Sequence, residues 1–135
     1  EEYASGESRK YRFLYTPYGL VRKKIGQSYA ADSTGKSSWN DCETTDFAYN
    51  KLGQIVEIKY MYVPGWGIPR IQKLFYNQKN QLYRITQSRI GNSDKECVLE
   101  YSIELNYNTN GFIESESRIS PEHGKSWLKY KYIQH

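Results

Sequence analysis

Residues 30–37 read Ala-Ala-Asp-Ser-Thr-Gly-Lys-Ser, which fits a relaxed phosphate-binding loop pattern with alanine in place of the first glycine. That chemistry requires a buried strand before the loop and a helix after it, so that backbone amides and the helix end surround the phosphates. The flanking segments, residues 22–27 and 38–42, have neither character. We therefore interpret Thr34-Gly35-Lys36 as an ordinary exposed turn.

Side chains suited to catalysis are scarce. A Cys97–His123 nucleophile pair would need a reduced and activated thiolate, and no other feature of the sequence supports one. Two carboxylate pairs could be considered for glycoside hydrolysis, but both are predicted to lie on the solvated faces of strands: Glu100 with Glu104, and Glu114 with Glu116. Neither cysteine has a neighbouring ligand at metal-site spacing. We predict no catalytic residue, no metal site and no cofactor, and hence a protein that is not an enzyme.

The chain has two cysteines, Cys42 and Cys97. An even pair in a small β-rich chain is typical of a disulfide formed in an oxidising compartment. The sequence begins at Glu1 without a methionine, which fits removal of a signal peptide or trimming for expression. No apolar run approaches the roughly 20 residues that a membrane-spanning helix needs. These features predict a Cys42–Cys97 disulfide, no membrane span, and a periplasmic or secreted location.

The segment from Val63 to Arg70 contains two prolines and two glycines around Trp66 and Ile68. Rigid aromatic loops on β scaffolds often anchor partners, so we predict partner contacts at Trp66, Ile68 and Arg70. The alternative, that Trp66 folds back over the core, stays open. Trp39 and Lys36 are second choices. They lie in a long connection, residues 26–45, that we expect to be functional or partly mobile, with Trp39 packed on the disulfide.

Composition favours sheets. Aromatic residues make up 16% of the chain, with 14 tyrosines, and tyrosine suits a half-buried pleated surface. The net charge of +4 permits an acidic partner without requiring one. The basic residues at 9, 10, 12 and 22–24 fall on strand-like segments, where a solvated face is the simpler interpretation.

Four segments share one pattern: a tyrosine, Asn or Thr, two free positions, Gly or Asn, one free position, and an aliphatic residue. They are Tyr15–Val21, Tyr49–Ile55, Tyr76–Leu82 and Tyr107–Ile113. The Asn or Thr can accept a hydrogen bond from the backbone two residues on. Gly19, Gly53, Asn80 and Gly111 can take the positive φ that a type I turn with a following bulge requires. The pattern predicts four hairpin turns.

The segments between these turns alternate as strands do. From Cys97 to Tyr107 the odd positions are mostly apolar, whereas the even positions from Glu100 on are polar, which predicts one buried and one wet face. No stretch shows sustained helical periodicity. We predict a single all-β domain over residues 1–135, with residues 1–9 as a flexible N-terminal segment. The fold is an antiparallel meander of eight or nine strands built from hairpins, curled into a sandwich or open barrel.

The repeated pattern resembles the YD repeat of bacterial RHS-type proteins, whose units run Tyr-Asp, two free residues, Gly, a polar residue, then Leu or Ile. Residues 49–55 match best, with Asn50 where that family prefers aspartate. The resemblance covers the four turns and their flanking strands, and four units are too few for the large shells of long RHS arrays. It implies a bacterial secreted or envelope β protein and assigns no activity.

Three functional hypotheses follow. The first is a non-catalytic periplasmic or secreted binding protein, most specifically an immunity or inhibitor protein that occludes a toxin or an envelope enzyme. The second is a carbohydrate- or cell-wall-binding module of YD-repeat type, which would use Trp66 and exposed tyrosines. The third is a nucleic-acid-binding β-barrel, which the glutamates at 100, 104, 114 and 116 make the least favoured of the three.

Overall fold

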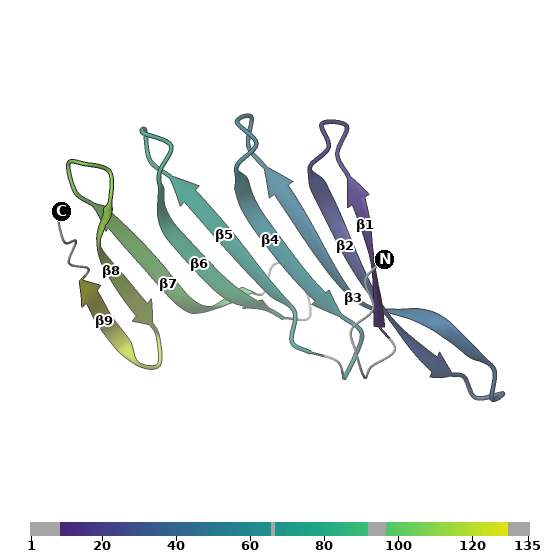
Figure 1. Cartoon of the computed structure of the whole chain (residues 1–135). Helices are drawn as coiled ribbons and strands as arrows, with labels where there is room; N and C mark the ends of the chain where they lie inside the picture. The colour runs from purple at the N-terminus through teal and green to yellow at the C-terminus, as the bar shows by residue number, and fades with distance from the viewer. Residues whose placement is uncertain (1–8, 66, 92–96, 130–135) are drawn as a thin grey trace, which may run out of the picture. The chain divides into compact units, whose positions relative to one another are not determined.

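The computed structural model describes residues 9–65, 67–91 and 97–129, in which every regular element is a β-strand (Figure 1). The chain divides into two compact units, Glu1–Arg70 and Ile71–His135. The predicted flexible segment lies outside the described residues except for Arg9, which begins the first strand. No helix in the described ranges is long and apolar enough to cross a membrane. The strands are β1 (Arg9–Tyr15), β2 (Val21–Ala31), β3 (Ser37–Tyr49), β4 (Ile55–Tyr62), β5 (Arg70–Tyr76), β6 (Leu82–Ile90), β7 (Cys97–Tyr107), β8 (Ile113–Ser120) and β9 (Gly124–Lys129).

Within each unit the strand order follows the chain order. In the first unit β1, β2, β3 and β4 pair successively and antiparallel. In the second unit β6, β7, β8 and β9 do the same. The prediction of an all-β antiparallel meander is therefore confirmed, and the sheet of each unit is open.

All four predicted turns are present. The residues expected to be left-handed have φ of 83° at Gly19, 78° at Gly53, 60° at Asn80 and 84° at Gly111. The pairing register shifts immediately before three of these turns, next to the pattern tyrosines at 15, 49 and 107. A left-handed residue beside a shifted register is the G1 bulge that the pattern predicted.

The first turn residue does more than the sequence indicated, because its side-chain oxygen accepts two backbone amides. Asn50 Oδ1 accepts from Leu52 N and Gln54 N at 3.0 Å each. Asn108 Oδ1 accepts in the same way from the amides two and four residues on, as do Asn77 Oδ1 and Thr16 Oγ1. One short side chain thus satisfies two amides that the turn leaves without a strand partner.

A fifth turn of this kind joins β2 to β3. Asp32 Oδ1 accepts from Thr34 N at 2.8 Å and Lys36 N at 3.1 Å, and Gly35 has φ of 82°. The predicted exposed turn is correct here, but the predicted long connection over residues 26–45 is wrong. That segment consists of two paired strands and their turn. This turn falls outside the repeated pattern because Ala31 and Ser37 occupy the positions where the pattern has a tyrosine and an aliphatic residue.

The pattern tyrosines connect neighbouring hairpins. Tyr49 at the end of β3 donates its hydroxyl to the carbonyl of Val21 at 2.6 Å, and Tyr107 at the end of β7 donates to the carbonyl of Leu82 at 2.6 Å. Both acceptors are the aliphatic position that closes the previous turn of the same unit. The tyrosine of one repeat is therefore hydrogen-bonded to the backbone of the repeat before it.

The open sheets bury little. Among the described residues the buried hydrophobic side chains are Ile25, Cys42 and Ile90. The predicted wet face of residues 97–107 is wrong at Ser102, which is only 4% exposed. Its longer neighbour Arg84 lies over it and donates Nε–H to its Oγ at 3.3 Å. Alternation assigns a residue to a face, but side chains of the adjacent strand decide whether water reaches it.

We expect Asn108→Ala to destabilise the protein by roughly 1–2 kcal/mol, because two backbone amides lose their acceptor. Urea unfolding followed by circular dichroism measures the change. Asn110→Ala in the same exposed turn is the matched control. The backbone N–H of Asn110 keeps its hydrogen bond to Asn108 Oδ1 when the Asn110 side chain is removed. Equal losses in the two variants would contradict the capping role.

Tyr107→Phe should cost about 1 kcal/mol of stability, because the carbonyl of Leu82 loses its donor. Burial raises the pKa of Tyr107 above its usual value of 10.0. The folded state therefore holds the neutral phenol while the unfolded chain ionises, so stability falls as pH rises above 10. Urea unfolding at pH 7 and pH 10.5 should show the gap between wild type and Tyr107→Phe shrinking, whereas Tyr15→Phe should change little at either pH.

Candidate functional site

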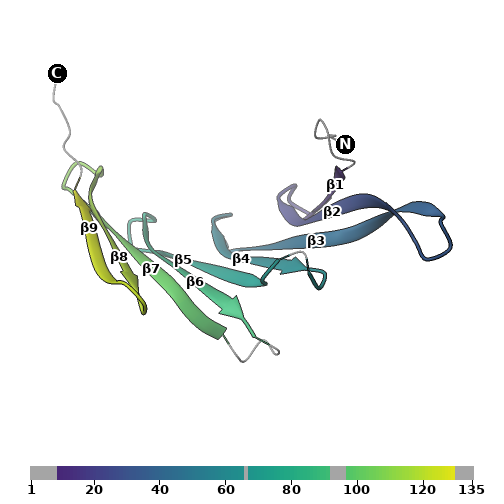
Figure 2. The ribbon, with the colours of Figure 1, turned by 90° about the horizontal axis from the view of Figure 1, so that it is seen from below.

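The far ends of β2 and β3 form a two-stranded ribbon in the first unit (Figure 1). The recorded pairings of β1 with β2 end at Ser28, and those of β4 with β3 end at Glu43. Beyond these points the described strands pair with each other alone, from Tyr29 opposite Trp39 to the turn at residues 32–36. Among the described residues no other strand pairs with either edge of the ribbon, which extends beyond β1 and β4 (Figure 2).

An aromatic and cationic cluster lies at the base of this ribbon. The rings of Tyr29 and Trp39 are 5.3 Å apart and tilted by 53°. Lys10 Nζ from β1 lies 4.7 Å from the centroid of the Trp39 ring. Tyr29 remains 50% exposed. Tryptophan and tyrosine dominate the binding energy of protein interfaces, so this cluster is a candidate anchor.

The predicted binding residues fall on two elements of the first unit. Trp39 and Lys36 lie on the ribbon, with Lys36 in its exposed turn. Ile68 is 48% exposed in the segment before β5, and Arg70 is the half-buried first residue of β5. Trp66 lies outside the described residues. Sequence reasoning missed Tyr29, although its spacing gave a signal: Tyr29 and Trp39 are equally distant from Thr34 and so face each other across the hairpin.

The segment before β5 contains a glycine that its packing requires. A Cβ atom at Gly67 would lie 2.9 Å from the ring of Tyr62, closer than side-chain atoms pack. The amide of Val63 donates to the carbonyl of Cys42 at 3.0 Å and ties the start of this segment to β3. The backbone immediately before Ile68 therefore packs against the ring of Tyr62.

The predicted disulfide is wrong. Cys42 and Cys97, both among the described residues, are present as thiols. Cys42 is buried in β3 of the first unit, where its Sγ donates to the carbonyl of Gly26 at 3.2 Å. Cys97 is exposed at the start of β7 in the second unit. Trp39 therefore packs against Tyr29 and Lys10, and not on a disulfide.

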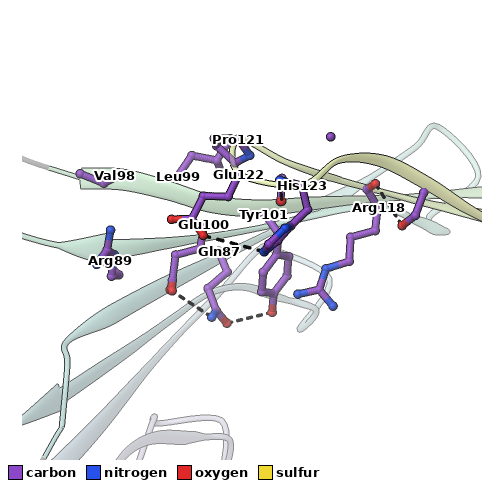
Figure 3. A pocket seen from close by; sticks show the side chains of 13 residues that line it. Gln87, Arg89, Val98, Leu99, Glu100, Tyr101, Arg118, Pro121, Glu122 and His123 are labelled. Carbon is purple, nitrogen blue, oxygen red and sulfur yellow. Dashed lines mark hydrogen bonds and ion pairs between the residues drawn. The ribbon is translucent and has the colours of Figure 1, made fainter.

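The second unit contains a concavity of about 600 Å³ lined by β6, β7, β8, the turn before β9 and the start of β9 (Figure 3). Gln87 is central: its Nε2 donates to Glu100 at 3.2 Å, and its Oε1 accepts from the Tyr101 hydroxyl at 2.9 Å. The guanidinium of Arg118 lies 4.4 Å from the centroid of the Tyr101 ring. The rim includes Val98, which is 55% exposed.

A β-bulge aims two neighbouring residues into this concavity. Gln87 pairs with Tyr101 and Ser88 pairs with Leu99, so that Glu100 is the extra residue on β7. Strict alternation placed Glu100 on the face opposite Tyr101, and that expectation is wrong. Bulges commonly redirect side chains at binding sites, and this one brings a carboxylate, a phenol and an amide together.

A second concavity of about 780 Å³ lies between the two turns of the same unit. Amide side chains dominate its lining, together with Tyr83, Tyr107 and Lys79. Asn77 and Asn108 are occupied in capping their turns, whereas Gln78 and Asn110 are exposed at the turns. The arrangement offers uncharged hydrogen-bonding groups beside aromatic rings.

No protein-family model matches the chain, and no curated protein matches it in sequence. In structure the chain is similar to a crystal structure of a protein with unknown function from Bacteroides fragilis NCTC 9343. The two are 10% identical, the match covers 93% of this chain and 91% of that chain, and the TM-score is 0.49. A likeness at this level carries no argument about function.

The two thiols should react at different rates. Burial raises the pKa of Cys42, which keeps its thiol protonated and inaccessible. Iodoacetamide at pH 8 under native conditions should therefore label Cys97 rapidly and Cys42 only after unfolding, as peptide mass spectrometry would show. Omitting the reductant should not reduce the total labelling of the denatured chain. If both cysteines of the denatured chain stay unlabelled when reductant is omitted, the two residues form a disulfide after all.

Proposed function

We propose that this protein is a non-catalytic binding protein that acts outside the bacterial cytoplasm by occluding a protein partner. The most specific form of the proposal is an immunity or inhibitor protein for a toxin or an envelope enzyme. One observation carries it: the ribbon formed by β2 and β3 projects beyond its neighbouring strands and presents a paired tyrosine and tryptophan.

A projecting ribbon can enter a cleft that a flat sheet cannot. Its turn is held by three hydrogen bonds to the Asp32 carboxylate, from Thr34 N, Thr34 Oγ1 and Lys36 N. These hydrogen bonds, above all the one from the Thr34 hydroxyl, lower the pKa of Asp32. At neutral pH the carboxylate is therefore charged and can accept all three hydrogen bonds. A preorganised turn loses little conformational freedom on binding, which favours affinity.

The base of the ribbon supplies the anchor. Tyr29 and Trp39 lie side by side, and the ammonium group of Lys10 makes a cation–π contact with the Trp39 ring. A partner that covers Tyr29 and the edge of Trp39 would bury aromatic surface at the centre of the contact and leave Lys36 at its rim. Central aromatic anchors with polar rims are typical of tight protein interfaces.

The bacterial envelope setting is part of the same proposal. It is supported by the resemblance of the four tyrosine turns to the YD repeat, and those turns have the predicted conformation. The thiol state of Cys42 and Cys97 removes the disulfide as support for an oxidising compartment. The proposed location therefore depends on the resemblance.

The alternative is carbohydrate binding, and the two concavities of the second unit favour it. One combines Gln87, Glu100, Tyr101 and Arg118, and the other is rich in Asn and Gln side chains. Planar amide, carboxylate and guanidinium groups beside aromatic rings are suited to sugar hydroxyls and ring faces. Calorimetric titration with soluble peptidoglycan fragments separates the two functions, because partner occlusion predicts no heat of binding.

The partner proposal is tested by affinity capture from bacterial periplasm with the full chain, followed by binding and inhibition assays on the purified partner. Trp39→Ala should weaken binding by roughly 30-fold or more, as expected when an interface anchor is removed. Inhibition of the partner should weaken in parallel. Trp127→Ala is the matched control, because Trp127 is 57% exposed on β9 of the second unit.

Equal effects of the two tryptophan substitutions would contradict an anchor on the ribbon. A captured partner whose activity the protein leaves unchanged would contradict occlusion.

A further inference from the structure

The end of the first unit opposite the ribbon presents apolar side chains at the tips of two turns. Tyr18, in the turn between β1 and β2, is 91% exposed, and Leu52, in the turn between β3 and β4, is 67% exposed. Tyr15 beside the first turn is 57% exposed. The equivalent tip positions of the second unit are polar, Lys79 and Asn110, so the apolar tips are not a requirement of the turn.

These two tips are held side by side. Tyr49, which precedes the second turn, donates its hydroxyl to the carbonyl of Val21, which follows the first. A Cβ atom at Gly53 would lie 3.8 Å from Leu20 Cδ1, so the two turns lie close together. Thr16 and Asn50 cap the backbone of each turn. The tips therefore project from a rigid support.

Two exposed basic residues accompany the tips. The basic residues at 9, 10 and 12 lie toward the ribbon, since Arg9 pairs with Ser28 and Lys10 with Gln27. At this end Arg22 and Lys51 are exposed. Lys23 is engaged with Asp46 at 3.3 Å. Glu57 is the acidic residue that follows the second turn along β4.

We propose that this end of the first unit docks peripherally on an anionic phospholipid bilayer. Tyr18 and Leu52 would enter the headgroup region, and Arg22 and Lys51 would contact anionic headgroups. Tyrosine is favoured at membrane interfaces because its ring is apolar and its hydroxyl polar. Shallow apolar insertion combined with basic residues gives reversible membrane attachment.

The observations favour a bilayer over a protein partner at this end. Tyr18 and Leu52 lie at the tips of separate turns with the exposed Arg22 and Lys51 beside them, which suits shallow insertion with cations at the headgroups. The backbone amides of Tyr18 and Leu52 already donate to Thr16 Oγ1 and Asn50 Oδ1, so these two tip residues can enter the headgroup region with their N–H groups paired.

Docking here leaves the ribbon accessible. β2 runs from Val21 at the docking end to Ala31 at the ribbon, a distance of roughly 33 Å along an extended strand. The membrane proposal does not depend on the proposed partner, and either one can fail alone.

The test is co-sedimentation of the full chain with vesicles in 100 mM NaCl. We expect binding to vesicles of 70% phosphatidylcholine and 30% phosphatidylglycerol, and at least tenfold weaker partitioning on phosphatidylcholine alone or in 500 mM NaCl. Tyr18→Ser/Leu52→Ser should reduce partitioning at least tenfold. Arg22→Gln/Lys51→Gln should reduce it by about 25-fold, since each cation near an anionic surface contributes about fivefold.

The matched control is Phe112→Ser/Leu128→Ser, which removes two exposed apolar side chains from the second unit. This control should partition like the wild type, and circular dichroism should show every variant folded. Absence of vesicle binding by the wild type would overturn the proposal, and so would equal losses in the tip variant and the control.

Discussion

The structure depends on one local constraint: a short polar side chain that accepts two backbone amides at the start of a turn. Thr16, Asp32, Asn50, Asn77 and Asn108 all do this, each followed three residues later by a left-handed residue. The interaction is complete within five residues, so each hairpin is specified before any distant contact forms. Strand pairing, the bulges and the tyrosine hydrogen bonds between hairpins all follow from where these turns reverse the chain.

Because each unit is an open sheet, its stability comes from hydrogen-bonded ladders, cross-strand pairs and links between hairpins more than from a large core. Tyr49 and Tyr107 are examples of such links, because the hydroxyl of each donates a hydrogen bond to the backbone of a neighbouring hairpin. A tyrosine-rich, aliphatic-poor composition suits such a design. The same design leaves aromatic side chains exposed, and these supply the surfaces on which the functional proposals rest.

The functional proposals concern the ends of strands. β2 is long enough to extend past β1 into the ribbon at one end and to reach the contacting turns at the other. The ribbon has an aromatic pair with a lysine over it, whereas the two turns have single apolar tips beside the exposed Arg22 and Lys51. Different chemistry at the two ends of one strand allows two contacts that do not compete for the same surface. The second unit adds a polar site in the concavity where a bulge places Glu100 beside Tyr101.

The sequence by itself determined the β class, an antiparallel meander of eight or nine strands and the positions of the four tyrosine turns, because turn chemistry and alternation act over a few residues. Only the tertiary structure decided what the tyrosine hydroxyls bond to, that Ser102 is covered by Arg84, and that Glu100 shares a face with Tyr101. It also decided that Tyr29 packs on Trp39 and that Cys42 and Cys97 are thiols in different units. Each of these depends on which residues of adjacent strands meet, and a single register shift changes that pairing while leaving the sequence pattern unaltered.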